Sequence, residues 1–309
     1  MMNIATLTLN PTIDLAYVVD KLEPTDKLRA PPQQADPGGG GINVARVFVR
    51  MGGNARCIYL SGGSTGIALD ALLDLHQLVR ERVAIEGHTR VSTTILEQGS
   101  GKEFRVVPAG PEVKESEWQD CLDRIDTLQC DYLVMSGSLP RGMPTAFYAR
   151  AATKAHRRGI RTVLDTSGAA LKEGVSAGGH ELIKPNLKEF EQLIGKGLTT
   201  PEAIGKAAQS VARQGGARLV AVTMGEDGGI LASADEVWRC EAPQVETASA
   251  VGAGDSFVAA MVYGLANGRN EFDAFRLGIA GGTAALITAG TGLARAEDTQ
   301  GIFAQLAAG

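Results

Sequence analysis

Short apolar runs alternate with longer segments of helical period along most of the chain. Runs rich in β-branched residues predict strands, and apolar residues three and four apart predict helices. Strands that alternate with helices of this length predict an α/β fold, a doubly wound, mostly parallel sheet flanked by helices on both faces. The expected strands include Ile4–Leu9, Arg56–Leu60, Tyr132–Ser136, Arg161–Leu164, Glu181–Lys184 and Arg218–Thr223. The clearest helical patterns are Ile42–Met51, Ser116–Leu128, Pro144–Arg158, Pro201–Gln214, Ala253–Asn267 and Phe272–Thr288, with Pro144 and Pro201 in first turns.

Two regions break this alternation and predict a small second sheet. The segments Leu15–Ala35 and Thr89–Val107, the latter with a polar turn at Gln98–Lys102, have the pattern of strands or hairpins. No Pro- or Ser-rich linker, internal repeat or low-complexity tract divides the chain. We therefore expect a single domain over residues 1–309, with a lid formed by residues 15–35 and 89–107.

Glycine content, net charge and cysteine spacing exclude several classes of protein. The 309 residues include 39 glycines, against about 22 at average usage, so many backbone positions are kept free of a Cβ. The net charge of −5 argues against a nucleic-acid or polybasic membrane surface. The four cysteines show no disulfide or zinc spacing, and Met1–Pro11 has neither a leader pattern nor a membrane-spanning run. We expect a soluble, cytoplasmic protein.

The most informative segment is Ala250–Ser256, AVGAGDS, which enters a strongly helical run. Glycines at 252 and 254 allow a tight turn that directs free helix N–H groups toward an anion. Asp255, in the first helical turn, would lie beside that anion, ionised by the helix N-terminus, and could orient and deprotonate an attacking hydroxyl. Taken alone, the same pattern is equally that of an ordinary turn capped by an aspartate.

A second glycine cluster, Pro37–Arg46 (PGGGGINVAR), also opens a helix. Four glycines in succession suit the close approach of a ligand to the backbone, with Asn43 binding a sugar hydroxyl; the alternative is a mobile loop. The chain has no GxxxxGK[ST] segment and no GxGxxG after the first strand, which argues against a P-loop NTPase or a standard dinucleotide-binding domain.

One segment favours a different class of enzyme. Gly62–Gly66 (GGSTG) matches the GxSxG pattern of a hydrolase nucleophile at Ser64 and lies between an expected strand and helix. Such hydrolases place their histidine late in the chain, whereas the last histidine here is His180. The hydrolase hypothesis therefore lacks a partner for the serine.

Five motifs in order resemble the PfkB-type carbohydrate kinases of the ribokinase superfamily. They are Thr8–Asp14, Pro37–Arg46, Ser136–Pro140, Lys184–Glu189 and the GAGD segment, and the resemblance covers nearly the whole chain. It implies a ribokinase-like fold and phosphoryl transfer from ATP to a sugar. Within the family, Lys27–Arg29 and Pro37–Arg46 are most similar to members that act on fructose 6-phosphate.

The resemblance also implies roles for single residues. Asp255 would be the catalytic carboxylate, with Gly252, Ala253 and Gly254 forming the anion turn. Asp14, Gly39, Gly40, Asn43 and Ser138 would bind the sugar, and Lys27, Arg90 and Arg105 its phosphate. The nucleotide would contact Lys184, Asn186, Thr223, Gly225, Gly228, Ser249, Val251, Gly252, Gly254 and Thr283, although Thr223–Gly229 also suits a plain hairpin turn. Magnesium would be positioned by Asn186, Glu189 and Asp165.

The implied reaction converts fructose 6-phosphate and MgATP to fructose 1,6-bisphosphate and MgADP. The 1-phosphofructokinase and tagatose-6-phosphate kinase activities remain alternatives, because the catalytic motif faces only the reacting hydroxyl; a further alternative is a sugar-phosphate sensor without turnover. The family also implies a homodimer through the lid. Ala250 and Thr288 depart from the family's threonine and asparagine, which weighs against activation by potassium (K+).

Overall fold

The computed structural model describes residues 3–24, 27–31 and 34–308. Met1, Met2 and Gly309, and residues 25–26 and 32–33 of the expected lid segment, lie outside the described residues.

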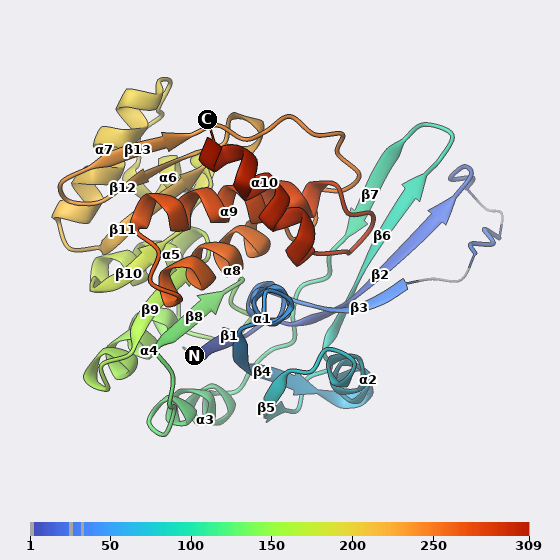
Figure 1. Ribbon diagram of the computed structural model, residues 1–309. Coiled ribbons are helices and arrows are strands. Elements are labelled where there is room, and N and C mark those ends of the chain that lie inside the picture. The colour runs from blue at the N-terminus through green and yellow to red at the C-terminus, as the bar shows by residue number, and fades with distance from the viewer. Residues whose placement is uncertain (1–2, 25–26, 32–33, 309) are drawn as a thin grey trace.

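A nine-stranded sheet forms the middle layer of the molecule, in the order β13-β12-β11-β10-β9-β8-β1-β4-β5 (Figure 1). All neighbours are parallel except β11 with β12 and β12 with β13. The chain builds outward from β1 to β4 and β5, and returns to the other side of β1 with β8. In such sheets a crevice opens at the carboxyl ends of the strands where the direction of building reverses, here β1 and β8. The strands are β1 Asn3–Thr8, β4 Asn54–Gly62, β5 Val79–Ile85, β8 Tyr132–Ser136, β9 Arg161–Asp165, β10 His180–Ile183, β11 Ala217–Thr223, β12 Gly229–Ala232 and β13 Val237–Cys240.

Helices cover both faces of this sheet. One hydrophobic core lies under α1, α2, α8, α9 and α10, and a second lies under α3 to α7. The central strand β8 is buried along its whole length, as a strand covered on both faces must be. The helices are α1 Gly40–Arg50, α2 Gly63–Asp74, α3 Glu115–Ile125, α4 Phe147–Arg157, α5 Gly168–Ala177, α6 Leu187–Ile194, α7 Pro201–Arg213, α8 Ala253–Ala266, α9 Glu271–Leu286 and α10 Ala296–Ala308, with a 3-10 turn η1 at Gly225–Asp227.

The predicted second sheet is present and extends from one side of the body (Figure 1). It has four strands in the order β3-β2-β6-β7: β2 Thr12–Val19, β3 Gln34–Gly38, β6 Arg90–Glu97 and β7 Lys102–Val106. Strand β2 follows β1 after only three residues, so the root of this sheet, which we call the lid, lies at the crevice between β1 and β8.

The structure corrects the position of Pro144. We expected it in the first turn of a helix, but α4 begins at Phe147, and Phe147 N donates to Pro144 O (2.9 Å) in the preceding turn. Pro201 does occupy the first turn of α7, with Thr200 as N-cap. None of the helices in the described part of the chain is long and apolar enough to cross a membrane.

Candidate active site

A cavity of about 290 Å³ lies at the carboxyl ends of β1, β8 and β9, between the body and the lid. It is lined by the first turns of α1 and α8 and by side chains from β2, β6 and β7. Its walls include many residues that the sequence predicts for the site: Asp14, Gly39, Gly40, Asn43, Arg90, Arg105, Ser138, Asp165, Glu189, Val251, Gly252 and Asp255. Eight separate segments of the chain therefore meet at the crevice that the sheet topology creates.

The glycine run Gly38–Gly41, whose last two residues begin α1, is tightly packed. A Cβ on Gly40 would overlap Ser136 Oγ, and one on Gly41 would lie 2.8 Å from Leu7 O. Gly39, the residue before α1, has φ +115°, a conformation that side chains other than glycine rarely adopt. The backbone of this run thus rests directly on the ends of β1 and β8, and the alternative of a mobile loop does not hold.

The GAGD segment forms the expected turn at the start of α8. Gly252 is left-handed (φ 73°, ψ 7°), and a Cβ there would overlap Leu293 Cδ2. The helix begins at Ala253, so the unpaired N–H groups of its first turn face the cavity end that Val251 and Gly252 line. This arrangement is a ready-made anion site.

Asp255 is more basic than the sequence suggests. We expected the helix N-terminus to keep it ionised, but burial and the neighbouring Asp165 raise its pKa to about 7. Asn43 Nδ2 donates to Asp255 Oδ2 (2.9 Å), which together with Lys184 opposes the increase. The effect of burial is larger than that of the helix terminus, because the carboxylate loses more hydration free energy than the helix dipole restores. A carboxylate with a pKa near neutrality is well suited to accept a proton from a hydroxyl.

Lys184 and Asp165 form a buried ion pair beside this turn. Lys184 Nζ lies 3.0 Å from Asp165 Oδ1, and a Cβ on Gly254 would lie 3.5 Å from the same ammonium. Burial lowers the pKa of Lys184, but Asp165, Glu189 and Asp255 together raise it above its usual range. A fixed positive charge is therefore held at the mouth of the anion turn.

The NxxE motif forms a helix cap in this structure. Asn186 Oδ1 accepts from Glu189 N (2.9 Å), and Glu189 Oε2 accepts from Asn186 N (2.8 Å), which is a capping box at the start of α6. Within the described ranges, no three His, Cys, Asp or Glu side chains come together to hold a metal. The oxygen ligands of Asp165 and Glu189 in the cavity nevertheless fit magnesium, which keeps several waters and needs few carboxylates when a phosphate supplies the rest.

Two of the three predicted phosphate cations lie at the lid side of the cavity. Arg90 donates to Asn10 O (2.9 Å) and to Pro108 O (3.2 Å), which fixes its guanidinium, and the exposed Arg105 projects from β7. Lys27 does not line the cavity; it is exposed in the described segment 27–31 between β2 and β3. Within one chain, Lys27 is thus separated from the other two cations.

The predicted nucleotide residues are divided between several places. Asn186, Thr223 and Gly225 line a neighbouring cavity of about 430 Å³ on the far side of the α6 N-terminus. Gly228 lies in the turn before β12, and a Cβ there would overlap Cys240 O. Ser249 and Thr283 are buried and line neither cavity; Ser249 Oγ accepts from Val251 N (3.2 Å) and so supports the anion turn.

Sequence reasoning missed several residues that line the cavity. Thr166 and Ser167 follow β9, and Thr12 and Ser92 join β2 to β6 through a hydroxyl contact of 2.9 Å. Their positions could have indicated them, since each lies at or within three residues of a strand end beside the crevice. Asn10, part of the first motif, donates to Ser138 Oγ (3.1 Å) and so connects the segment before β2 to the segment after β8.

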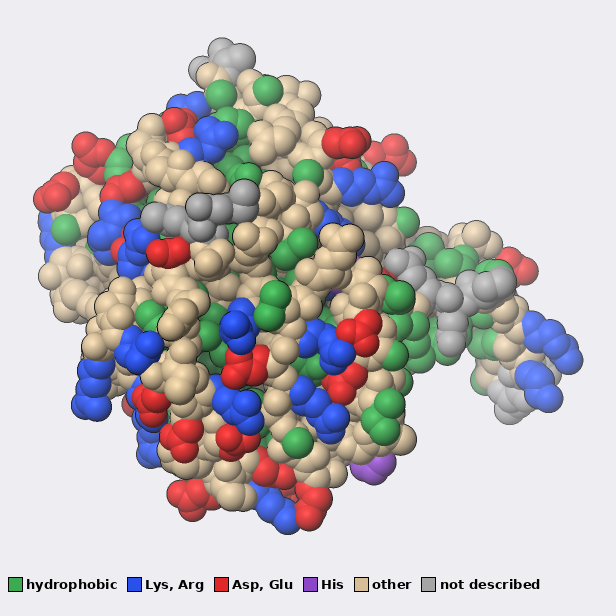
Figure 2. Space-filling view, turned by 60° about the horizontal axis from the view of Figure 1, so that its bottom comes forward, with side chains coloured by type: hydrophobic (Ala, Val, Ile, Leu, Met, Phe, Trp, Pro, Cys, Tyr) green, Lys and Arg blue, Asp and Glu red, His purple; other side chains and the backbone are tan. Residues whose placement is uncertain are grey.

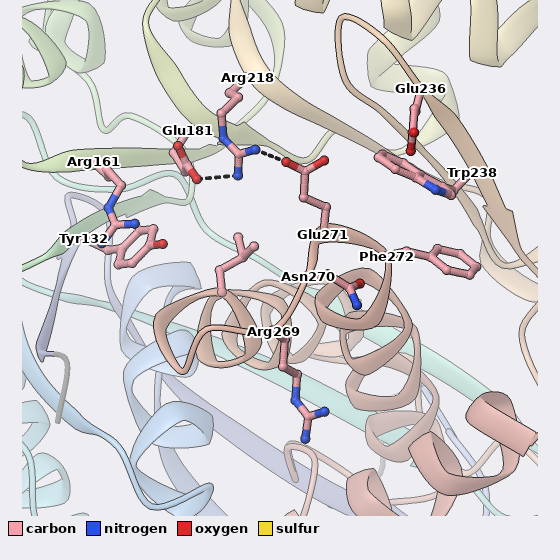
Figure 3. A pocket seen from close by; sticks show the side chains of 11 residues that line it. Tyr132, Arg161, Glu181, Arg218, Glu236, Trp238, Arg269, Asn270, Glu271 and Phe272 are labelled. Carbon is pink, nitrogen blue, oxygen red and sulfur yellow. Dashed lines mark hydrogen bonds and ion pairs between the residues drawn. The ribbon is translucent and has the colours of Figure 1, made fainter.

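A different cavity, of about 590 Å³, lies at the opposite edge of the main sheet. Several of its charged side chains contact neighbouring lining residues: Arg218 pairs with Glu181 and Glu271, and Arg161 lies over the ring of Tyr132 (Figure 3). These contacts connect the amino-terminal ends of the strands to the start of α9. Ser64, the predicted hydrolase nucleophile, is exposed in the first turn of α2 and lines none of these three cavities.

An anion turn, a neutral-range carboxylate and a fixed lysine beneath a lid with arginines define the site of a small-molecule kinase. Comparison with known proteins agrees. Residues 7–299 match the pfkB family carbohydrate kinases, and the chain belongs to this family.

Two relatives are similar over nearly the whole chain. ATP-dependent 6-phosphofructokinase isozyme 2 of Escherichia coli (strain K12) is 36% identical over 307 residues, 99% of both chains. The protein of the same name from Mycobacterium tuberculosis (strain CDC 1551 / Oshkosh) is 37% identical over 303 residues, 97% of this chain and 88% of that one.

Solved structures match equally well. Crystal structures of phosphofructokinase-2 from Escherichia coli in complex with potassium, in complex with fructose-6-phosphate and in a tetrameric inhibited form have TM-scores of 0.95, 0.93 and 0.93. Each covers 99% of this chain and 100% of its own. Arabidopsis thaliana ribokinase, 18% identical with a TM-score of 0.75 over 98% of both chains, shares the fold. The predicted ribokinase-like fold with a small sheet lid is confirmed.

The contact between Asn43 and Asp255 predicts a shift in pH dependence. Asn43→Leu removes a hydrogen bond that favours the charged carboxylate, so the acid limb of kcat/KM for the sugar should move upward by about one pH unit. Asn43→Asp adds a second negative charge and should move it further. The measurement is a pH–rate profile from pH 5 to 9. Thr166→Val, another cavity change, is the control; a limb that stays in place in both Asn43 variants would contradict the assignment.

Proposed function

We propose that this protein is an ATP-dependent 6-phosphofructokinase that transfers the γ-phosphoryl group of MgATP to the 1-hydroxyl of fructose 6-phosphate. The observation that carries the proposal is the position of Asp255: its carboxylate lies at the mouth of the anion turn, in a cavity whose opposite wall holds Arg90 and Arg105. Two relatives named for this activity, similar over almost their full length, support the choice of acceptor.

The chemistry follows from the arrangement of these side chains. The oxygen of the sugar's 1-hydroxyl forms a bond to the γ-phosphorus of ATP, and the bond between that phosphorus and the bridging oxygen of ADP breaks. Asp255 accepts the proton that the hydroxyl loses. The N–H groups at Gly252–Gly254 and the ammonium of Lys184 stabilise charge on the moving phosphoryl group. Magnesium, when bound, neutralises phosphate charge, and Asp165 and Glu189 would hold it largely through water. Closure of the lid over this single domain excludes water that would compete as acceptor.

A panel of acceptors tests the proposal directly. We expect kcat/KM to be highest for fructose 6-phosphate among fructose 6-phosphate, fructose 1-phosphate, tagatose 6-phosphate, fructose and ribose, measured by coupled ADP release. Asp255→Asn should lower kcat by about 10²- to 10⁴-fold, the scale for a lost acid–base group, while Asp120→Asn on the exposed face of α3 should not. Higher kcat/KM with fructose 1-phosphate or tagatose 6-phosphate would favour those alternatives, and binding without ADP release would indicate a sensor.

The two lid arginines should determine selectivity for a phosphorylated sugar. Arg105→Ala and Arg90→Ala should raise KM for fructose 6-phosphate about 10- to 100-fold, the scale of one or two charge-assisted hydrogen bonds, with KM for ATP nearly unchanged. Fructose, which has no phosphate, serves as the control acceptor, and its KM should not change. Arg105→Ala is the cleaner variant, because Arg90 also holds the backbone of Asn10 and Pro108. Equal increases for both substrates would contradict this role.

We further infer a homodimer through the lid. In Figure 2 the lid projects from the body as an arm with hydrophobic side chains along it. Several of its large apolar side chains are exposed, among them Leu96, Phe104 and Val106, and β7 is exposed along its whole length. Exposed apolar area of this kind marks an interaction surface. Sedimentation equilibrium should give a dimer that Phe104→Glu dissociates, and a monomeric wild-type protein would refute it.

Two smaller inferences accompany this function. The cysteines Cys57, Cys121, Cys130 and Cys240 are all unpaired thiols, which supports a reducing, cytoplasmic location that cell fractionation can test. Potassium occurs in one crystal structure of the Escherichia coli relative. Ala250 here has no side-chain oxygen to offer such a cation, which weighs against activation by potassium; rates with and without KCl test this.

A further inference from the structure

A buried ion pair lies at the root of the lid, next to the sugar side of the cavity. Arg46, on α1, donates through Nη2 to Asp36 Oδ1 (2.8 Å) and through Nη1 to Pro37 O (2.8 Å). Thr291 donates to the other carboxylate oxygen, Asp36 Oδ2 (2.6 Å). Arg46 and Asp36 are 3% and 7% exposed, so each charge depends on the other for compensation.

Asp36 is the register partner of Asp14, the carboxylate of the sugar site. The two residues face each other across the antiparallel pair of β3 and β2, and side chains of directly opposed residues lie on the same face of a sheet. Asp14 lines the cavity, whereas Asp36 is bound from behind by α1 and by the segment after α9. Asp14 and Asp36 are thus neighbours on one face of the lid root, and the guanidinium of Arg46 reaches this root from α1.

Arg46 interacts with both of these carboxylates. Burial raises the pKa of Asp14, and Arg105, Arg90 and, more weakly, Arg46 lower it. Burial lowers the pKa of Arg46, while Asp36 and, more weakly, Asp14 raise it. Among the described residues the buried Nε of Arg46 has no acceptor, so its guanidinium retains a donor for a second carboxylate.

We propose that Asp36 is a positioning residue for the sugar site: it holds Arg46 as its own counter-ion and thereby leaves the carboxylate of Asp14 available to the hydroxyls of the sugar. The inference rests on the proposed function, because it assigns Asp14 to a polyol substrate. If Asp36 lost its charge, Arg46 would be drawn to Asp14, the other carboxylate that raises its pKa. Several elements place charged groups around Asp14: Arg105 on β7, Arg90 on β6 and Arg46 on α1 lower its pKa, and Asp36 is its register partner on β3. Asp14 in turn raises the pKa of Asp255 on α8.

Two single variants should have opposite effects. Asp36→Asn releases Arg46 toward Asp14, so affinity for fructose 6-phosphate should fall about tenfold, the scale of one hydrogen bond to a charged group, with ATP affinity unchanged. The acid limb of sugar binding should move to lower pH, because an added positive neighbour lowers the pKa of a carboxyl. Arg46→Met removes the positive charge and leaves Asp36 uncompensated, so the same limb should move to higher pH. Calorimetric titration with fructose 6-phosphate from pH 5 to 9 measures both.

The double variant Asp36→Asn/Arg46→Met keeps the test decisive if a single variant fails to fold. Replacing both members of a buried ion pair is often tolerated, whereas removing one is not. Since its two charge changes cancel at Asp14, its affinity and acid limb should return to within about threefold and a few tenths of a pH unit of the wild type. A purely structural role would lower the melting temperature in these variants without shifts of opposite sign.

Carboxyl ¹³C titration of Asp14 in the ligand-free protein separates this inference from the proposed function. The pKa of Asp14 should be lower in Asp36→Asn and higher in Arg46→Met than in the wild type, whichever sugar the enzyme uses. Lack of binding of fructose 6-phosphate to the wild type would overturn the proposed function alone. The role of Asp36 would be overturned if the pKa of Asp14 were unchanged in both folded single variants. It would also be overturned if the double variant shifted this pKa as much as Asp36→Asn does.

Discussion

The structure depends on how one buried and three half-buried carboxylates are kept apart at one crevice. Asp255 receives a hydrogen bond from Asn43, Asp165 pairs with Lys184, and Asp36 pairs with Arg46. Asp14 has a less direct arrangement, since it is stabilised at a distance by arginines of the lid and of α1. Buried carboxylates without such partners would protonate or destabilise the fold. The positions of the partner residues therefore determine which carboxylate can react and which can bind.

Helix α1 supplies much of this organisation. Asn43, Arg46 and Arg50 are spaced three and four residues apart and so lie along one face of the helix. In order they contact the carboxylate of Asp255, the root of the lid, and the backbone of Leu293, which packs against Gly252. A single helix thus connects Asp255, the lid and the glycine turn before α8, and displacement of α1 would disturb all three together.

The sequence predicts the central strands and helices well because their apolar periodicity is set by burial on one or both faces of the sheet. It predicts Pro144 poorly, since a proline in a turn just before a helix resembles one in the first turn. Among site residues, the glycine turns and Asp255 could be found from local pattern. The raised pKa of Asp255 could not, because it arises from burial and from Asp165, and the use of Asn43 as its partner could not, because the two residues come from distant segments of the chain. The position of Lys27 outside the cavity is likewise a property of the lid's geometry.

The glycine run before α1 shows why such a site is conformationally expensive to build. Each glycine in an ordered element is less stable than alanine by about 0.5–1 kcal/mol, yet alanine at Gly40 would overlap Ser136 Oγ, and at Gly41 would press on Leu7 O. This close fit of the backbone on β1 and β8 fixes the start of α1, from which Asn43 donates to Asp255 (2.9 Å). The glycines thus lower the stability of this segment but allow the side-chain amide of Asn43 to be placed correctly. Such a cost in stability is expected at positions that function requires.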